Sequence, residues 1–215
     1  MLSPYLSKLN NKKIILASGS VARKAILEQA GLEIIVSPSS FAEDLDKTGL
    51  THKEYVKSTS EHKLLNKIEE LKSNGEKADI IIVGDTIISF ENEIIEKAED
   101  EADAINILTK LSGESHSVLS SAYIAFLDED LEILYKENIF NSTKVEFYHF
   151  GEDVIAEYMK TGEAYGKAGC YGIQGTAATW IKNMDGCYYS VWGFPLSQFC
   201  VKMVEMINIT GFLDE

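Results

Sequence analysis

The first forty residues follow a strand, helix, strand pattern, and this order restricts the fold more than any other feature of the chain. KIIL at 13–16 has the pattern of a short buried strand, and EIIVSP at 33–38 has that of a second strand. Between them, SVARKAILEQAG at 20–31 has helical spacing and ends in Gly31, a typical C-cap residue. We therefore expect a β-α-β unit, which is typical of sheets covered by helices.

The middle of the chain alternates between helix and strand patterns. The stretch 51–75 predicts a long helix that ends at Asn74-Gly75. The strand-like run ADIIIVGDTIISF at 78–90 is followed by a returning strand at 91–97 and by a helix at 99–113, whose acidic residues lie at its N-terminal end. The expected core stripe of the long helix consists of Leu64, Leu65, Ile68 and Leu71.

The last hundred residues add antiparallel patterns. The stretch 116–150 predicts a long hairpin that turns at 128–130, and 151–162 predicts a short helix. We expect a second β region at 176–193 and a last helix that opens at Pro195. With no internal repeat and no clear linker, the chain is expected to form mixed α/β structure, with helices on a sheet that is partly parallel and partly antiparallel.

Charge and cysteine usage restrict the partners and the compartment. The chain of 215 residues has 34 acidic and 20 basic side chains and a net charge of −14, which makes it a poor candidate for binding nucleic acid, because that requires a basic face. An anionic small substrate would need a local group of cations and a divalent metal. The three cysteines include no CxxC pair, and no apolar run is long enough for a signal peptide or a membrane span. We expect a cytoplasmic protein without a membrane partner.

Small hydroxyl residues follow the first strand, in LASGS at 16–20, and Arg23 lies one helical turn further on. A helix N-terminus presents free backbone N–H groups and partial positive charge, which suit a phosphate. The hydroxyls of Ser18 and Ser20 and the guanidinium of Arg23 can add donors. The same residues also fit an ordinary N-cap serine beside a surface arginine, and the pattern alone favours that interpretation.

A carboxylate ends the most apolar strand pattern, as Asp85 in VGDT. Ligands of α/β proteins bind at this end of a strand, where a carboxylate can hold a metal ion or accept a proton from water. A lone Asp there also fits a turn or a cap. Lys63, Lys97 and Lys167 would neutralise phosphate if they converged, although each one alone fits a surface lysine. The four histidines form no metal-binding pair, and we assign them to structure.

The segment GKAGCYGIQG at 166–175 has a glycine at every third position, and we refer to it as the glycine-rich segment. The stretch Gly162 to Ala168, which overlaps its start, is not a Walker A loop, because the spacing is one residue short and Ala168 stands where Ser or Thr should bind magnesium. A collagen repeat needs many more triplets and abundant proline. We expect a loop whose glycines allow sharp turns and close approach of the backbone.

Taken together and in this order, these stretches resemble the Maf family of nucleoside triphosphate pyrophosphatases, from Ile14 to about Leu196. The resemblance implies an α/β fold of the Maf-like (anticodon-binding/ITPase-like) type. It also implies a single domain over 1–215, with two lobes of mixed sheet and flanking helices around a central active-site groove. The motifs that carry it are LASGS with Arg23, VGDT, Lys97, LSG with His116, and KAGCYGIQG.

The activity implied by the resemblance is hydrolysis of a nucleoside triphosphate to the monophosphate and pyrophosphate. Water would attack the α-phosphorus with the help of a divalent cation (Mg²⁺, Mn²⁺ or Co²⁺), and the protein would form a homodimer. The pair Asp85-Thr86 and the stretch YGIQG at 171–175 resemble the branch that acts on dTTP and UTP. The alternatives are other modified nucleotides such as 7-methyl-GTP, or a nucleotide-binding regulator without turnover.

The resemblance also implies a role for individual residues. Asp85 would be the catalytic carboxylate that activates water, as a general base or through the metal, and it would share the metal with Glu43. This sequence departs from the family pattern at Val21-Ala22, Ala42, Ala98, Glu114 and Gly166, the last of which replaces an acid, so that Glu163 is the nearest carboxylate in sequence. The implied substrate-binding residues are Ser18, Ser20, Arg23, Lys63, Thr86, Lys97, Lys167 and Gln174.

Overall fold

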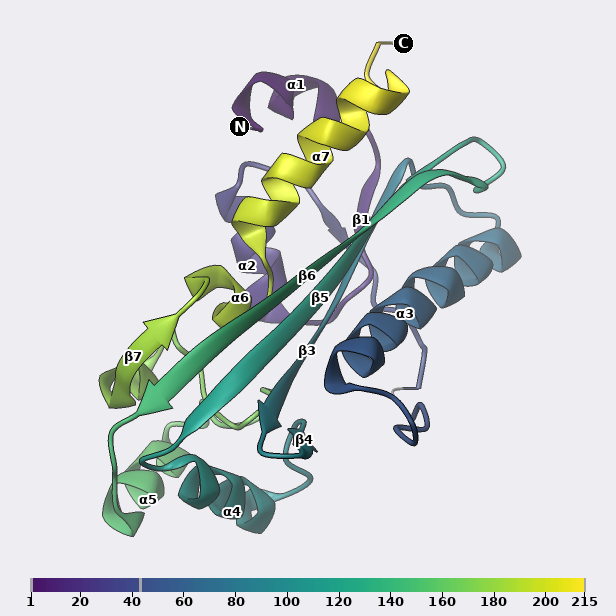
Figure 1. Cartoon of the computed structure of the whole chain (residues 1–215). Coiled ribbons are helices and arrows are strands. Elements are labelled where there is room, and N and C mark those ends of the chain that lie inside the picture. Colours follow the sequence, from purple (N-terminus) through teal and green to yellow (C-terminus); the bar gives the residue numbers. More distant parts are fainter. Residues whose placement is uncertain (1, 43, 215) are drawn as a thin grey trace. The chain divides into compact units, whose positions relative to one another are not determined.

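A mixed sheet of seven strands with flanking helices forms the protein, in a computed structural model that describes residues 2–42 and 44–214 (Figure 1). This confirms the expected α/β fold class. The strands are β1 (Ile14–Leu16), β2 (Ile35–Val36), β3 (Ile80–Phe90), β4 (Glu93–Ile95), β5 (Ser115–Leu127), β6 (Ile133–Phe147) and β7 (Ile181–Asp185). The helices are η1 (Ser3–Tyr5), α1 (Leu6–Leu9), α2 (Val21–Gln29), α3 (His52–Asn74), α4 (Glu101–Leu111), α5 (Glu152–Lys160), η2 (Thr176–Trp180), α6 (Tyr188–Trp192) and α7 (Leu196–Thr210).

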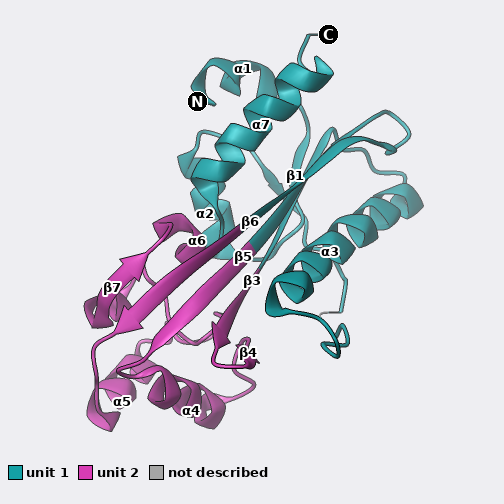
Figure 2. Ribbon diagram, viewed as in Figure 1, with its two compact units in different colours: residues 1–85, 121–140, 193–215 teal, residues 86–120, 141–192 magenta. Residues whose placement is uncertain are grey.

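The chain divides into two compact units (Figure 2). The long strands β3, β5 and β6 each contribute residues to both units. Unit 1 consists of residues 1–85, 121–140 and 193–215, and unit 2 consists of residues 86–120 and 141–192.

Unit 1 contains the parallel part of the sheet. β1 pairs in parallel with β2, where Ile15 lies opposite Ile35, and with β3, where Ile15 lies opposite Ile81. Helix α2 connects β1 to β2, which confirms the β-α-β unit expected from the sequence. Figure 1 shows α3 over one face of these strands and α2 and α7 over the other. Because both faces are covered, β1 and the first residues of β3, 80–83, are apolar and buried at consecutive positions.

Helix α3 has typical capping residues at both ends, and its buried face includes the polar residues Lys63 and Lys67. Thr51 and Glu54 form a capping box, and Gly75 ends the helix in the left-handed conformation at φ 66°. Three of the four expected core residues, Leu64, Ile68 and Leu71, are buried against the sheet. The prediction for Leu65 is wrong, since this residue is 40% exposed. It lies about 100° around the helix from Leu64, outside the stripe that faces the strands.

Unit 2 is built on antiparallel pairing. β4 pairs with β3 through Ile95 opposite Ile88, which confirms the expected returning strand, and β7 pairs with β6. Helices α4 and α5 contact each other. The core of the unit includes an aromatic group in which Phe150 stacks on Trp180 with ring centroids 4.4 Å apart.

The prediction of a second β region over 176–193 is wrong except for β7. The residues before β7 form the short helix η2, and those after it form α6. Ala177 and Trp180 are buried at a spacing of three, which suits one side of a 3₁₀ turn rather than a strand. In α6 the aromatic residues pack on one another, with Tyr189 stacked on Trp192. Their high β propensity therefore misled the sequence interpretation.

Two further observations concern the cysteines and the apolar character of the helices. Cys170, Cys187 and Cys200 are free cysteines, so no disulfide joins them. No helix within residues 2–42 and 44–214 combines the length and apolar character needed to cross a membrane.

Candidate active site

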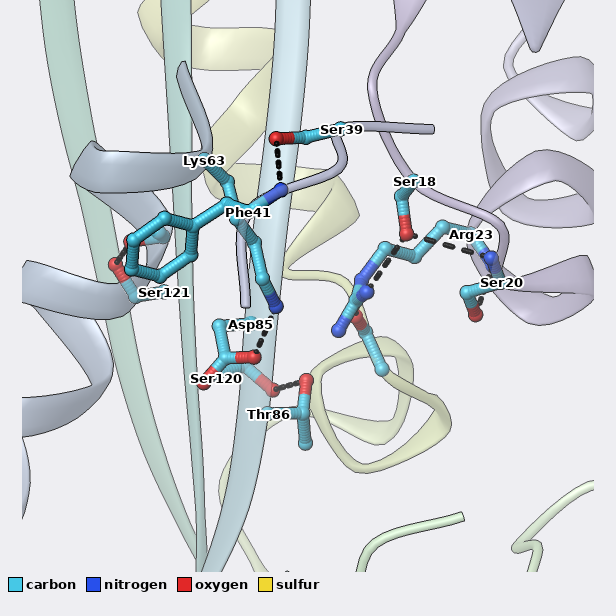
Figure 3. Close-up of polar contacts among 12 residues, drawn as sticks. Ser18, Ser20, Arg23, Ser39, Phe41, Lys63, Asp85, Thr86, Ser120 and Ser121 are labelled. Atoms are coloured by element: carbon cyan, nitrogen blue, oxygen red, sulfur yellow. Dashed lines mark hydrogen bonds and ion pairs between the residues drawn. The ribbon is translucent and has the colours of Figure 1, made fainter. Parts of the chain in front are cut away.

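The N-terminus of α2 combines a helix cap with an ordered arginine. Ser20 is the N-cap residue, and its hydroxyl accepts a hydrogen bond from the backbone N–H of Arg23 at 3.3 Å. The Arg23 guanidinium donates to the hydroxyl of Ser18 at 2.9 Å and to the carbonyl of Gly193 at 3.1 Å (Figure 3). Ser20 is therefore an N-cap residue, as one of the two sequence interpretations predicts. The side chain of Arg23 is not a freely exposed surface arginine, because it is held by hydrogen bonds. It is a fixed cation beside the α2 N-terminus.

The glycine of VGDT brings Arg23 against strand β3. A Cβ atom at Gly84 would lie 3.0 Å from Nε of Arg23 and 3.3 Å from the carbonyl oxygen of Ser121, which is tighter than ordinary packing. A side chain at this position would therefore require the guanidinium or the backbone to shift by a few tenths of an ångström. Arg23 therefore lies beside the strand position that immediately precedes Asp85.

Asp85 forms a buried ion pair with Lys63. The Nζ of Lys63 lies 2.8 Å from Oδ1 of Asp85, and each side chain is only 8% exposed (Figure 3). Lys63 lies on the face of α3 that covers the sheet, so the alternative of a surface lysine is wrong for this residue. Because breaking a buried pair leaves an uncompensated charge, the two residues depend on each other.

Hydroxyl groups next to Asp85 form a chain with a fixed direction. Ser120 donates to the carbonyl oxygen of Ser190 at 2.7 Å, and its oxygen lies 3.0 Å from Oγ1 of Thr86. A serine hydroxyl has one proton, so Thr86 must be the donor to Ser120. The Thr86 oxygen then has lone pairs with which it can accept a hydrogen bond from a ligand. Ser120 was not singled out from the sequence, because a serine inside a strand has no distinguishing pattern.

In unit 2 the glycine-rich segment pairs with the chain that follows β4. Lys97 and Ala168 form an antiparallel bridge, and the N–H of Gly169 donates to the carbonyl of Glu96 at 3.0 Å. Lys97 and Lys167 therefore come from neighbouring stretches of backbone, as a phosphate-binding pair would. The ammonium of Lys167 also donates to the carbonyl oxygen of Glu163.

Glu163, the carboxylate nearest to Gly166 in sequence, makes its hydrogen bonds with Thr176. Its carboxylate accepts hydrogen bonds from the backbone N–H of Thr176 at 3.0 Å and from the Thr176 hydroxyl at 2.9 Å. These bonds join the residues just before the glycine-rich segment to those just after it. Gln174 is exposed, and its amide group lies over Gly172.

His116 anchors the glycine-rich segment from inside unit 2. Its Nε2 lies 2.8 Å from the hydroxyl of Tyr171, and both rings contact Phe147 edge to face. His116 is 2% exposed, and its Nδ1 has no hydrogen-bond partner in the described part of the chain. Burial lowers its pKa to about 4. The structural role expected for this histidine fits its position.

The buried His116 predicts acid sensitivity. Its pKa is depressed in the folded protein and returns to about 6.5 on unfolding, so the unfolded state binds the extra proton between these values. The contribution of His116 is therefore complete at pH 7 and is lost as the pH falls toward 4. We expect a loss of about 2 kcal/mol between pH 7 and pH 5.

Urea unfolding at both pH values measures this effect. His116→Phe should remove most of this pH dependence, whereas the exposed His149→Gln should keep it. An equal pH dependence in the wild type and in His116→Phe would contradict the assignment.

The metal-binding prediction rests on Asp85 and Glu43, and Glu43 lies outside the described residues. Within residues 2–42 and 44–214, no three His, Cys, Asp or Glu side chains form a group that could hold a metal ion. Mg²⁺ usually binds one or two carboxylates and completes its shell with water and substrate phosphates. The donor set around Asp85 fits that mode of binding and does not fit a closed structural site.

The structure therefore places the remaining predicted residues in two groups. Unit 1 brings together Ser18, Ser20 and Arg23 at the α2 N-terminus, and Lys63 with Asp85 at the end of the parallel part of β3. Unit 2 contains Thr86, Lys97, Lys167 and Gln174, of which Lys97 and Lys167 lie on paired backbone segments.

Comparison with known proteins gives consistent matches. The model of the Maf-like protein family matches residues 13–206. A dTTP/UTP pyrophosphatase of Ruminiclostridium cellulolyticum is 34% identical over 92% of this chain and 97% of its own length, and one of Clostridium beijerinckii is 36% identical over 90% and 99%. A human protein described as a probable bifunctional dTTP/UTP pyrophosphatase/methyltransferase is 36% identical over 96% of this chain, which spans 34% of that protein's length.

Proposed function

Because the chain belongs to the Maf-like protein family, we propose that it hydrolyses dTTP and UTP to the nucleoside monophosphate and pyrophosphate. The substrate class comes from the names of the relatives that match it over most of their length. The observation that carries the proposal is the buried ion pair between Lys63 of α3 and Asp85 of β3. It lies beside the N-terminus of α2, where hydrogen bonds hold Arg23 in place. This group combines a water-activating acid with donors for phosphate.

The reaction requires little covalent chemistry from the protein. A water oxygen forms a bond to the α-phosphorus while the bridging bond from that phosphorus to the β-phosphate oxygen breaks, and pyrophosphate carries away the electron pair. Asp85 accepts the proton of the attacking water. Arg23 and the backbone N–H groups at the start of α2 hold phosphate oxygens, together with the hydroxyls of Ser18 and Ser20.

Lys63 has two functions in this scheme. Its ammonium has three donors, so it can bind a phosphate oxygen and still contact Asp85 through Oδ1. It thereby keeps the carboxylate oriented and adds positive charge where negative charge develops in the transition state. A local group of cations is needed because the net charge of −14 repels an anionic substrate at long range.

We propose a divalent cation, Mg²⁺, Mn²⁺ or Co²⁺, as the cofactor, held by Asp85 and Glu43. When bound, it would neutralise phosphate charge and lower the pKa of a water molecule. The ion pair with Lys63 uses Oδ1 of Asp85, and a carboxylate has further lone pairs for a metal.

From unit 2 we propose Thr86, Lys97, Lys167 and Gln174 as substrate-binding residues. With its proton directed to Ser120, the Thr86 hydroxyl would accept a hydrogen bond from an N–H or O–H of the nucleoside. The lysines would bind the phosphate chain. We also propose that the protein acts in the cytoplasm as a homodimer of single-domain subunits and does not bind nucleic acid, which the acidic charge supports.

The proposal is tested with a panel of nucleoside triphosphates. Purified protein is incubated with Mg²⁺ or Mn²⁺ and dTTP, UTP, CTP, ATP, GTP or 7-methyl-GTP, and pyrophosphate and orthophosphate are assayed separately. We expect pyrophosphate equal in amount to the monophosphate, formed fastest from dTTP and UTP. Binding without turnover would indicate a regulator, and orthophosphate as the first product would contradict the proposed reaction.

A further inference from the structure

A second lysine of α3, Lys67, is buried one turn beyond Lys63 and has no part in the proposed reaction. It is 4% exposed, compared with 7% for Lys63. Its ammonium lies 2.5 Å from Oε2 of Glu70 and donates to the hydroxyl of Ser37 at 3.1 Å. Lysine is rarely buried so completely, because removing its charge from water is costly unless a partner compensates. The position therefore requires an explanation beyond packing.

The partners of this part of α3 belong to one short stretch, residues 37–41, which we call the 37–41 segment. The backbone N–H and the hydroxyl of Ser40 both donate to Oε1 of Glu70, at 2.8 and 2.5 Å. The hydroxyl of Ser39 donates to Asn66, and the ring of Phe41 stacks on His62 with centroids 5.4 Å apart. The helix positions 62, 66, 67 and 70 form one stripe, so the segment lies along a single face of α3.

Charge on Glu70 holds this arrangement together. Burial opposes its ionisation, but hydrogen bonds from Lys67 and Ser40 outweigh burial and lower the pKa of the Glu70 carboxyl. Glu70 therefore receives the ammonium of Lys67 on one oxygen and the segment on the other. Loss of either charge would release the segment from the helix.

We propose that Lys67 is a positioning residue which, through Glu70 and Ser37, fixes the 37–41 segment beside the phosphate-binding end of the active site. Pro38 of this segment lies against the LASGS stretch, since a Cβ added at Gly19 would be 3.6 Å from its Cγ, and Figure 3 draws Ser39 and Phe41 together with Lys63. Phe41 contacts His62, the neighbour of Lys63 in the chain. The inference rests on the proposed function, because it gives the fixed segment a purpose in binding the triphosphate. A fixed boundary reduces the entropy lost when the substrate is bound.

The test compares two lysine variants of the same helix. Lys67→Met removes the buried charge, and Lys72→Met removes an exposed lysine that pairs with Glu132 on the surface. Glu70→Gln is a third variant, which keeps an acceptor oxygen for Ser40 and removes the charge that faces Lys67. For each protein, hydrogen exchange of the backbone amides of residues 39–42, the thermal midpoint, and KM and kcat for UTP are measured.

In Lys67→Met we expect faster exchange in residues 39–42 and a KM for UTP raised about tenfold, with kcat changed less than about threefold. Glu70→Gln should shift both quantities in the same direction, because it leaves the ammonium of Lys67 buried without its counter-ion, and Lys72→Met should match the wild type. A purely structural role would lower the thermal midpoint without a selective change in KM.

The proposal is overturned if Lys67→Met leaves the exchange of residues 39–42 unchanged, or if the exchange rises while KM stays at the wild-type value. Failure of the wild type to release pyrophosphate from UTP would refute the proposed function instead. In that case the exchange measurement still decides whether Lys67 holds the segment.

Discussion

Asp85→Asn is expected to slow pyrophosphate release from UTP by about three orders of magnitude, because an amide cannot accept the proton of the attacking water. The same change should destabilise the protein by about 3 kcal/mol, since Lys63 would remain buried without its counter-ion. The rate is measured as kcat/KM for UTP, and the stability is measured by urea unfolding.

A double variant separates these two effects. Lys63→Met combined with Asp85→Asn removes the buried charge that Asp85→Asn leaves behind, so most of the lost stability should return. Activity should not return, because the proton acceptor is still absent. Turnover in the double variant close to the wild-type rate would show that Asp85 is not the acceptor and that the single variant acted through misfolding.

Gly169→Ala is expected to destabilise the protein by about 3 kcal/mol. A Cβ at this position would lie 2.7 Å from Cγ1 of the buried Ile88, and the backbone has φ +69°, which costs about 1–2 kcal/mol for a residue with a side chain. Overpacking against a buried side chain adds about 1–3 kcal/mol. Urea unfolding of the variant and the wild type measures the sum.

Gly166→Ala is the matched control for Gly169→Ala. Gly166 has nearly the same backbone conformation, with φ +72°, but no heavy atom of the described residues lies within 4 Å of an added Cβ. Its substitution should therefore cost only about 1 kcal/mol of backbone strain. If both variants lost the same stability, the close approach of Gly169 to Ile88 of β3 would make no contribution to the cost of the substitution.

Local patterns were sufficient to predict most of the fold. The β-α-β start, the long helix α3 and the returning strand β4 each have a period or a cap that is encoded within a few residues. Leu65 shows where this fails, because an apolar residue beside a stripe looks the same in sequence as one within it. The sequence does not predict helix α6, because its aromatic residues favour strands, and their packing on one another is visible only in the structure.

The candidate site could be predicted where a motif marks the residue. Arg23 and Asp85 stand next to recognisable strand ends, and the structure gives each of them an ordered environment. Lys67 has no motif, because only the tertiary contacts with Ser37 and Glu70 distinguish it from a surface lysine.

The central claim is that water attacks the α-phosphorus of the nucleotide. Hydrolysis of UTP in water labelled with heavy oxygen tests it directly, since mass spectrometry then shows which product contains the label. Attack at the α-phosphorus places the label in UMP and leaves pyrophosphate unlabelled, and this is the expected result. Label in pyrophosphate or in orthophosphate would contradict the claim, because the bond to the β- or γ-phosphorus would then have formed instead.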